Sequence, residues 1–347
     1  MTSPLVSCAD LAASLSGPQP PVLLDVRWRL GGPPGREDYG RGHLPGAVFL
    51  DLDTDLAAPP GSGGRHPLPA PADLERVLRA AGVRAGAPVV AYDADNGSIA
   101  ARMWWLLRWA GHDQVRVLDG GYAAWAGEGR PVTTDVPTPE PGDVTVDAGQ
   151  LPVVDADGAA ALARSGVLLD ARAPERYRGD VEPIDARAGH VPGAVNAPFA
   201  AHAGEDGRWR TSAELAEHFA KLGVTAPGAG AGTAGARGVA GARAAGGGGA
   251  VGSDENGGAT GGSGDGSVER QDSTGGAGAV AGGVSGAAGP RVVGAYCGSG
   301  VTATSVLLAL EVAGITSPAA PGVLYAGSWS EWGLDSAREV ATGGEPG

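Results

Sequence analysis

Residues 291–310 read RVVGAYCGSGVTATSVLLAL: a short apolar run, a turn with glycines around Cys297, and a helix-like run. Residues 88–107, PVVAYDADNGSIAARMWWLL, have the same pattern. A short apolar strand followed by a tight turn and a helix is typical of α/β folds with a parallel sheet. Two copies of this unit predict that the same fold occurs twice in the chain.

Three further pairs of segments repeat in the same order. They are VLLDVRW at 22–28 with VLLDARA at 167–173, GHLPGAVFLD at 42–51 with GHVPGAVNAP at 189–198, and VLDGGYAAWAGEG at 117–129 with VLYAGSWSEWGLD at 323–335. Four ordered matches indicate a tandem duplication. Short strands alternate with helical patterns such as DLERVLRAAG and ELAEHFAKLG. We therefore predict an α/β fold of two tandem domains, each a parallel sheet flanked by helices.

The repeats and the composition between them set the domain boundaries. We place the first domain at residues 1–135, a linker at 136–150 and the second domain at 151–347. Prolines and acidic residues in TTDVPTPEPGD, residues 133–143, predict an extended connector. Residues 227–289 are mostly Gly and Ala with almost no large apolar side chains, which predicts a disordered, low-complexity insertion in the second domain. This composition favours an inert loop expansion over a binding motif.

The composition excludes several classes of function. A formal net charge of -14 disfavours nucleic acid and anionic membranes as partners, because an acidic surface repels phosphates. The N-terminus lacks a signal-peptide pattern and no apolar run is long enough for a membrane span, so we expect a cytoplasmic protein. The two cysteines, Cys8 and Cys297, lie in no disulfide framework and no zinc motif. We expect reduced thiols and no metal.

Cys297 lies where an α/β sheet binds its ligands, beyond the carboxyl end of a strand. Gly298 and Gly300 allow the turn to point backbone N–H groups inward, beside the positive end of the following helix. Such a nest favours the thiolate, which predicts a nucleophile. The alternative is a buried core cysteine, for which flanking glycines and hydroxyls are a poor setting. The first copy has Asp93 at the equivalent position, so only the second copy carries the nucleophile.

Taken together, the tandem copies, GHxPGA in each, the loop CGSGVTA and the closing LYAGSWSEW resemble the two-domain rhodanese family of sulfurtransferases. The resemblance covers the chain outside the insertion. It implies that Cys297 attacks the sulfur of a small-molecule donor, becomes a persulfide, and passes the outer sulfur to a thiol, cyanide or thioredoxin, with no cofactor. It also implies that Gly298, Gly300, Val301 and Thr302 belong to the loop that cradles the persulfide.

The loop is similar to that of the 3-mercaptopyruvate sulfurtransferase branch, whereas thiosulfate sulfurtransferases carry the basic loop CRKGVTA. The resemblance therefore implies 3-mercaptopyruvate as the donor, with thiosulfate as the alternative. It places Ser299 and Asp53 in a Cys–Ser–Asp relay that moves protons, and His66 on the substrate side. Without the resemblance, Asp53 in FLDLDTDL would be interpreted as a solvated or capping acid.

A donor carboxylate needs an arginine, whose planar fork binds both oxygens. The resemblance assigns this contact to Arg176 and expects a second arginine nine positions later, where this chain has Asp185. Either Arg178 or Arg187 supplies the second contact, or the preference has moved toward thiosulfate. For Arg178 and Arg187 individually, a surface salt bridge with Asp180 or Asp185 is the favoured alternative.

Residues present in both copies are expected to be structural, because only one copy has the thiol. His43 and His190 of the GHxPGA motif and Arg172 of LLDAR belong to this group. Two rival functions remain to be separated. A cysteine phosphatase needs an arginine where this chain has Ala303. A noncatalytic sulfur carrier or regulatory module would be indicated by a decayed cysteine loop, and this loop is intact.

Overall fold

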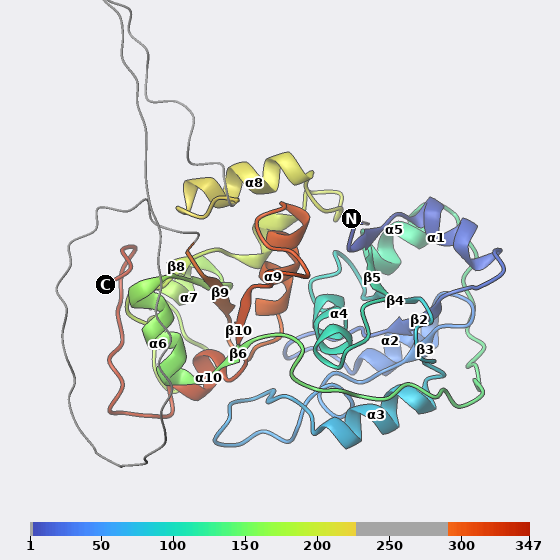
Figure 1. Cartoon of the computed structure of the whole chain (residues 1–347), viewed down its shortest axis with the longest axis horizontal. Helices are drawn as coiled ribbons and strands as arrows, with labels where there is room; N and C mark the ends of the chain where they lie inside the picture. The colour runs from blue at the N-terminus through green and yellow to red at the C-terminus, as the bar shows by residue number, and fades with distance from the viewer. Residues whose placement is uncertain (1–2, 227–290) are drawn as a thin grey trace, which may run out of the picture. The chain divides into compact units, whose positions relative to one another are not determined.

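The computed structural model describes residues 3–226 and 291–347. Its first half contains a five-stranded parallel sheet with the strand order β1-β5-β4-β2-β3 (Figure 1). The strands are β1 (Leu5–Val6), β2 (Val22–Asp25), β3 (Val48–Phe49), β4 (Val89–Tyr92) and β5 (Val115–Leu118). The helices are α1 (Cys8–Leu15), α2 (Gly35–Arg41), α3 (Pro71–Ala80), α4 (Ala100–Trp109) and α5 (Gly121–Gly127).

The second half repeats this topology in a five-stranded parallel sheet with the order β6-β10-β9-β7-β8. Its strands are β6 (Val153–Val154), β7 (Val167–Asp170), β8 (Val195–Asn196), β9 (Val293–Tyr296) and β10 (Val323–Tyr325). Its helices are α6 (Ala156–Ser165), α7 (Pro174–Arg178), the 3-10 helix η1 (Phe199–His202), α8 (Ser212–Lys221), α9 (Ala303–Val312) and α10 (Ser328–Trp332). The predicted pair of α/β domains is confirmed, while the predicted insertion at 227–289 lies outside the described residues.

The central strands are apolar because helices cover both faces of a parallel sheet. Every residue of β4 and of β9 is buried. Two helices of the second half are capped by side chains: Asp155 accepts the Gly158 N–H at the start of α6, and Thr211 and Glu214 form a capping box at the start of α8. Within the residues that the structure describes, no helix is long and apolar enough to cross a bilayer.

The duplicated polar residues hold each copy together, as expected. The Arg172 guanidinium donates to the Asp170 carboxylate at 2.6 Å and to the Gly189 carbonyl at 2.7 Å. Arg172 and Asp170 are both buried. The first copy repeats both bonds with Arg27, Asp25 and Gly42. An arginine buried with its own carboxylate and a carbonyl of the GHxPGA turn therefore ties strand to turn in both halves.

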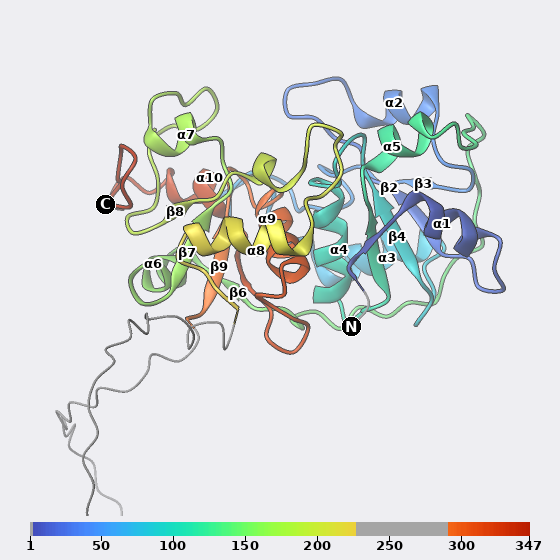
Figure 2. The same cartoon turned by 90° about the horizontal axis from the view of Figure 1, so that it is seen from above.

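Helices α4 and α9, which follow the two equivalent turns, lie side by side in both views (Figures 1 and 2). All ten residues of α4 are buried, including Trp104, Trp105 and Trp109. A helix that is buried all round belongs to the interior between layers. This packing brings the turn before α9, with Cys297, against the first half of the chain.

Candidate active site

The turn after β9 holds the Cys297 sulfur against backbone N–H groups. Cys297 is 2% exposed, and its Sγ accepts the Gly300 N–H at 3.1 Å and the Ser299 N–H at 3.4 Å. Gly300 has a φ of +82°, and a Cβ there would lie 2.3 Å from the Ala326 carbonyl oxygen. Only glycine fits this position, so the predicted nest is present and its glycine is required by both backbone and space.

The segment before and within α10 supports the turn from its other side. The Ser328 hydroxyl accepts the Cys297 N–H at 3.0 Å and donates to the Tyr325 carbonyl at 2.9 Å. The Trp329 N–H donates to the Cys297 carbonyl at 2.9 Å. Ser328 has a φ of +55°, the single positive value at a non-glycine residue in the described ranges. Strain of this kind persists where the surroundings over-determine it, and here it aims a hydroxyl at the cysteine backbone.

A chain of hydrogen bonds joins the turn to the first half of the protein. The Ser299 hydroxyl lies 2.7 Å from His66 Nδ1, and His66 Nε2 lies 2.8 Å from an Asp53 carboxylate oxygen. Ser299 and His66 are both 7% exposed. The expected relay of Cys, Ser and Asp is therefore interrupted by an imidazole: His66, expected on the substrate side, stands between Ser299 and Asp53.

The surroundings of His66 favour its neutral form. Burial lowers the pKa of His66 below its ordinary value, while the hydrogen bond and charge of Asp53 raise it in part. When Nε2–H donates to Asp53, Nδ1 is left to accept the Ser299 hydroxyl proton. The geometry can therefore move a proton between Ser299 and His66, with Asp53 orienting the ring and stabilising its charged form.

Arg102 places a buried positive charge behind the turn. It is 0% exposed, and its guanidinium donates to the carbonyls of Gly300 at 3.3 Å and His66 at 3.1 Å. Burial lowers the pKa of Arg102 to about 10, and the charge of Cys297 acts in the opposite direction. Arg102 is therefore cationic at neutral pH and attracts a thiolate. Arg102 is not among the residues predicted from the sequence, although an arginine within the apolar AARMWWLLRW is a signal.

Two arginines lie against the glycine that follows the cysteine. A Cβ on Gly298 would lie 2.9 Å from Arg65 Nη2 and 3.4 Å from Arg176 Nη1. Arg176 is the predicted carboxylate-binding residue. Arg65 was missed, although it precedes His66 in GGRHPLP. Its backbone N–H donates to the Ser330 hydroxyl at 3.0 Å, which fixes this first-half segment on the second half.

The structure does not assign Arg178 or Arg187 to this pair of cations. Arg178 donates to Asp180 at 2.7 Å, and both side chains are largely exposed. Arg187 donates to the carbonyls of Asp335 and Arg338, each at 2.9 Å. Both guanidinium groups thus have other partners, and the second guanidinium beside Gly298 is that of Arg65.

Val301 and Thr302 continue the turn into α9. Val301 is buried, and its carbonyl accepts the Thr304 hydroxyl at 2.6 Å. Thr302 has helical backbone angles and is the N-cap residue of α9, but its side chain makes no capping bond. Both residues therefore shape the path from the nest into the helix.

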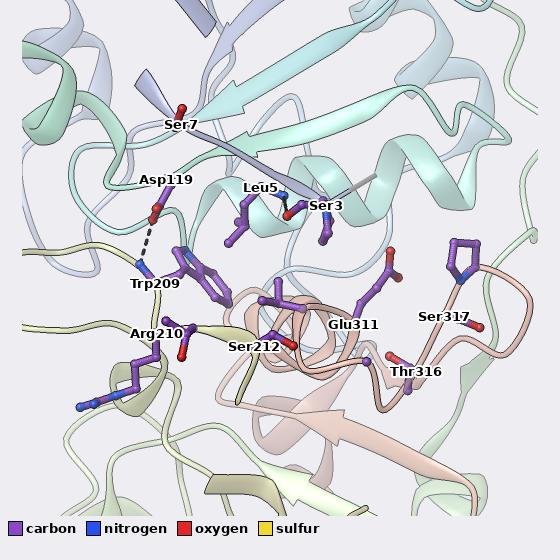
Figure 3. Close-up of a pocket in the computed structure, with 15 residues that line it drawn as sticks. Ser3, Leu5, Ser7, Asp119, Trp209, Arg210, Ser212, Glu311, Thr316 and Ser317 are labelled. Atoms are coloured by element: carbon purple, nitrogen blue, oxygen red, sulfur yellow. Dashed lines mark hydrogen bonds between the residues drawn. The ribbon is translucent and has the colours of Figure 1, made fainter. Parts of the chain in front are cut away.

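A cavity of about 680 Å³ lies elsewhere, between the N-terminal strand and the end of α9 (Figure 3). Leu5, Asp119, Trp209 and Glu311 are among its lining residues, and the Trp209 N–H donates to Asp119 at 2.8 Å. None of the residues around the cysteine lines it. Perturbed titratable groups and a nucleophile mark a reactive site better than volume does, so the candidate site is the Cys297 turn.

Comparisons with known proteins identify the family of the chain. Residues 7–128 match the rhodanese-like domain. The chain is 37% identical over 346 residues to a putative thiosulfate sulfurtransferase, SseB, of Mycobacterium tuberculosis, covering 98% of this chain and 97% of the relative. It is 39% identical over 345 residues to a probable 3-mercaptopyruvate sulfurtransferase of Pseudomonas aeruginosa, covering 98% of each. The crystal structure of SseA from Escherichia coli shares the fold, with a TM-score of 0.67, 24% identity, and coverage of 95% of this chain and 100% of that one.

Proposed function

Since this chain belongs to the rhodanese family of sulfurtransferases, we propose that it moves a sulfur atom from 3-mercaptopyruvate, through a persulfide on Cys297, to a thiol acceptor. One observation carries the proposal. The Cys297 sulfur accepts two backbone N–H bonds beside a hydrogen-bonded chain of Ser299, His66 and Asp53. The nest stabilises a sulfur anion, and the chain supplies a route for a proton.

In the first step, the Cys297 thiolate attacks the donor sulfur. The new S–S bond forms as the donor's S–C bond breaks, and the electron pair of that bond stays on carbon as the enolate of pyruvate. The donor thiol gives up its proton and the enolate takes one up, so the step needs no external acid or base. Ser299 is two positions after Cys297 in the chain, and its hydroxyl is hydrogen-bonded to His66. Ser299 and His66 are therefore the carriers of that proton.

In the second step, an acceptor thiolate or cyanide attacks the outer sulfur of the persulfide, and Cys297 leaves as a thiolate. The N–H groups of Ser299 and Gly300 stabilise this leaving group in the same way as they stabilise the attacking thiolate. Arg102 adds a buried cation behind the same turn. We propose a small thiol or a thioredoxin-like protein in the cytoplasm as the acceptor.

Thiosulfate is the alternative donor. Two observations favour it: the 37% identical relative is named a putative thiosulfate sulfurtransferase, and Arg65 and Arg176 provide two cations beside Gly298. Against it, residues 298–300 carry no cationic side chain, and a dianion gains most from a basic loop. Arg176 suits the single carboxylate of 3-mercaptopyruvate.

The test measures thiocyanate formation from cyanide with each donor, together with the mass of the donor-treated protein. We expect a higher kcat/KM with 3-mercaptopyruvate, and one added sulfur atom on Cys297. A higher kcat/KM with thiosulfate would move the assignment to that donor. Protein without an added sulfur atom after either donor would contradict the persulfide and favour a noncatalytic module.

A further inference from the structure

The two arginines at Gly298 are already bound to a carboxylate of the chain itself. One oxygen of Asp185 accepts a hydrogen bond from Arg65, and the other accepts one from Arg176 at 2.9 Å. The Asp185 side chain is only 6% exposed, whereas those of Arg65 and Arg176 are 25% and 15% exposed. A nearly buried carboxylate thus bridges Arg65 of the first half and Arg176 of the second, the two arginines beside Gly298.

A second acid fixes this arrangement. Glu182 accepts from Arg176 at 2.7 Å, and it also accepts the backbone N–H groups of Ile184 and Asp185, each at 3.1 Å. These bonds fold residues 182–185 so that the Asp185 carboxylate faces the arginines. Since Glu182 is bonded to the backbone as well as to Arg176, Asp185 is the less constrained of the two acids.

Formal charges cancel throughout the cluster. It consists of three guanidinium groups and three carboxylates, namely Arg65, Arg172, Arg176, Asp170, Glu182 and Asp185. An anion that approaches this cluster therefore meets no net positive charge until a carboxylate moves away. The group it must displace has the same chemistry as the carboxylate of an α-keto acid.

We propose that Asp185 is a specificity-determining residue: its carboxylate occupies the arginine pair until the anionic group of the donor displaces it, and its charge selects against dianionic donors. This inference rests on the proposed function of the Cys297 site. Repulsion from Asp185 grows with the charge of the donor, so thiosulfate is penalised more than a donor with a single carboxylate. The exchange of one carboxylate for another costs a monoanion less than it costs a dianion, because the arginines keep two charge-assisted hydrogen bonds and the repulsion from Asp185 is smaller.

The first test measures anion binding without turnover, in protein carrying Cys297→Ser. Calorimetry with pyruvate and with thiosulfate compares this protein with one that also carries Asp185→Asn. We expect pyruvate to bind about tenfold more tightly after the change, and thiosulfate to gain by a larger factor. Asp180→Asn is the matched control, because that acid pairs with Arg178 and is 55% exposed. The control should leave both dissociation constants unchanged.

The second test measures turnover in protein that retains Cys297. Asp185→Asn should lower KM for thiosulfate more than KM for 3-mercaptopyruvate and so shift the ratio of kcat/KM values toward thiosulfate. Adding Arg65→Met to the Asp185→Asn variant should reverse the gain in kcat/KM for thiosulfate. Asp185→Ser replaces the asparagine variant if circular dichroism shows that Asp185→Asn does not fold.

Unchanged or weaker binding of both anions in Asp185→Asn would overturn the inference, since it would show that Asp185 only positions the arginines. An equal gain for pyruvate and thiosulfate would overturn the selection against dianions. The binding comparison does not depend on sulfur transfer. An inactive protein would therefore contradict the proposed function while the role of Asp185 is still measured.

Discussion

The two halves of the molecule place an anion in the same kind of nest and use it differently. In the first half, the Asp93 carboxylate accepts four backbone N–H groups, at 2.8 to 3.1 Å. In the second half, the Cys297 sulfur accepts two, at 3.1 and 3.4 Å. The glycines of the two turns, Gly97 and Gly300, have φ values of +79° and +82°. Both turns therefore have a glycine at positive φ before a helix and point N–H groups at an acceptor, although Gly97 follows Asp93 by four residues and Gly300 follows Cys297 by three.

This difference shows how duplication divides a site. Asp93 is a buried occupant of its nest and is no thiol, so we expect the first copy to use this turn for structure. The first copy instead contributes His66, Asp53, Arg65 and Arg102 to the turn of the second. One half therefore presents the nucleophile, and the other surrounds it with charge and a proton route.

The largest effect on sulfur transfer should follow from replacing Cys297, which fills the nest of the second half. Cys297→Ser should lower sulfur transfer by at least about 1,000-fold, because an alcohol is a weak nucleophile that forms no persulfide. Thermal unfolding should change little. The measurement is thiocyanate formation with either donor. Retained turnover in Cys297→Ser would remove the assignment of the nucleophile.

Loss of the hydroxyl that links the halves should have the next largest effect. Ser299→Ala breaks the contact with His66 and should lower kcat with 3-mercaptopyruvate by about 100-fold or more, as is common for lost proton transfer. Ser98→Ala, a buried serine in the turn of the first half, is the matched control and should leave kcat unchanged. A similar decrease in both variants would point to packing rather than proton transfer.

Asp53→Asn should reveal how the first half tunes the site. Burial lowers the pKa of His66 from its ordinary 6.5. The enzyme should lose activity when His66 is protonated, so the acid limb of the kcat/KM profile should lie below pH 6.5. Asp53 raises the pKa of His66, and its removal should move the acid limb to still lower pH. The pH profiles of the two proteins measure this shift. An acid limb that stays in place or moves upward would contradict the role of His66.

The smallest effect on activity is expected from Asp93→Ala. The substitution leaves buried N–H groups without a partner, which should lower the free energy of unfolding by about 1–3 kcal/mol. Sulfur transfer at a temperature where the protein stays folded should be unchanged. Urea unfolding and steady-state kinetics separate the two quantities. Loss of turnover in a folded variant would show that the first nest also serves the reaction.

The sequence predicts the fold well because the repeat carries it. Strands such as VLLD and VVAY are apolar runs that end at turn residues, so the sheets, their number and the position of Cys297 follow from local patterns. Ser299 follows as well, since it lies in the same turn. These features depend on residues that are close together in the sequence, and the hydrophobic pattern of the sequence reflects such local relations directly.

The surroundings of Cys297 are harder to predict because packing between the halves creates them. His66 and Arg65 come from a segment without regular structure, where spacing carries no information about orientation. Arg102 reaches the turn only because α4 packs against α9. Arg65, and not Arg178 or Arg187, lies beside Gly298 with Arg176 for the same reason.

The bond between His66 and Ser299 joins residues 233 positions apart and crosses from one copy to the other. A duplicated gene normally begins as redundancy, in which either copy can be discarded. The proposed proton route crosses both copies, so we expect neither copy alone to be a complete catalyst. The copy without the thiol is therefore no spare, because it supplies the imidazole and the carboxylate of the proposed route.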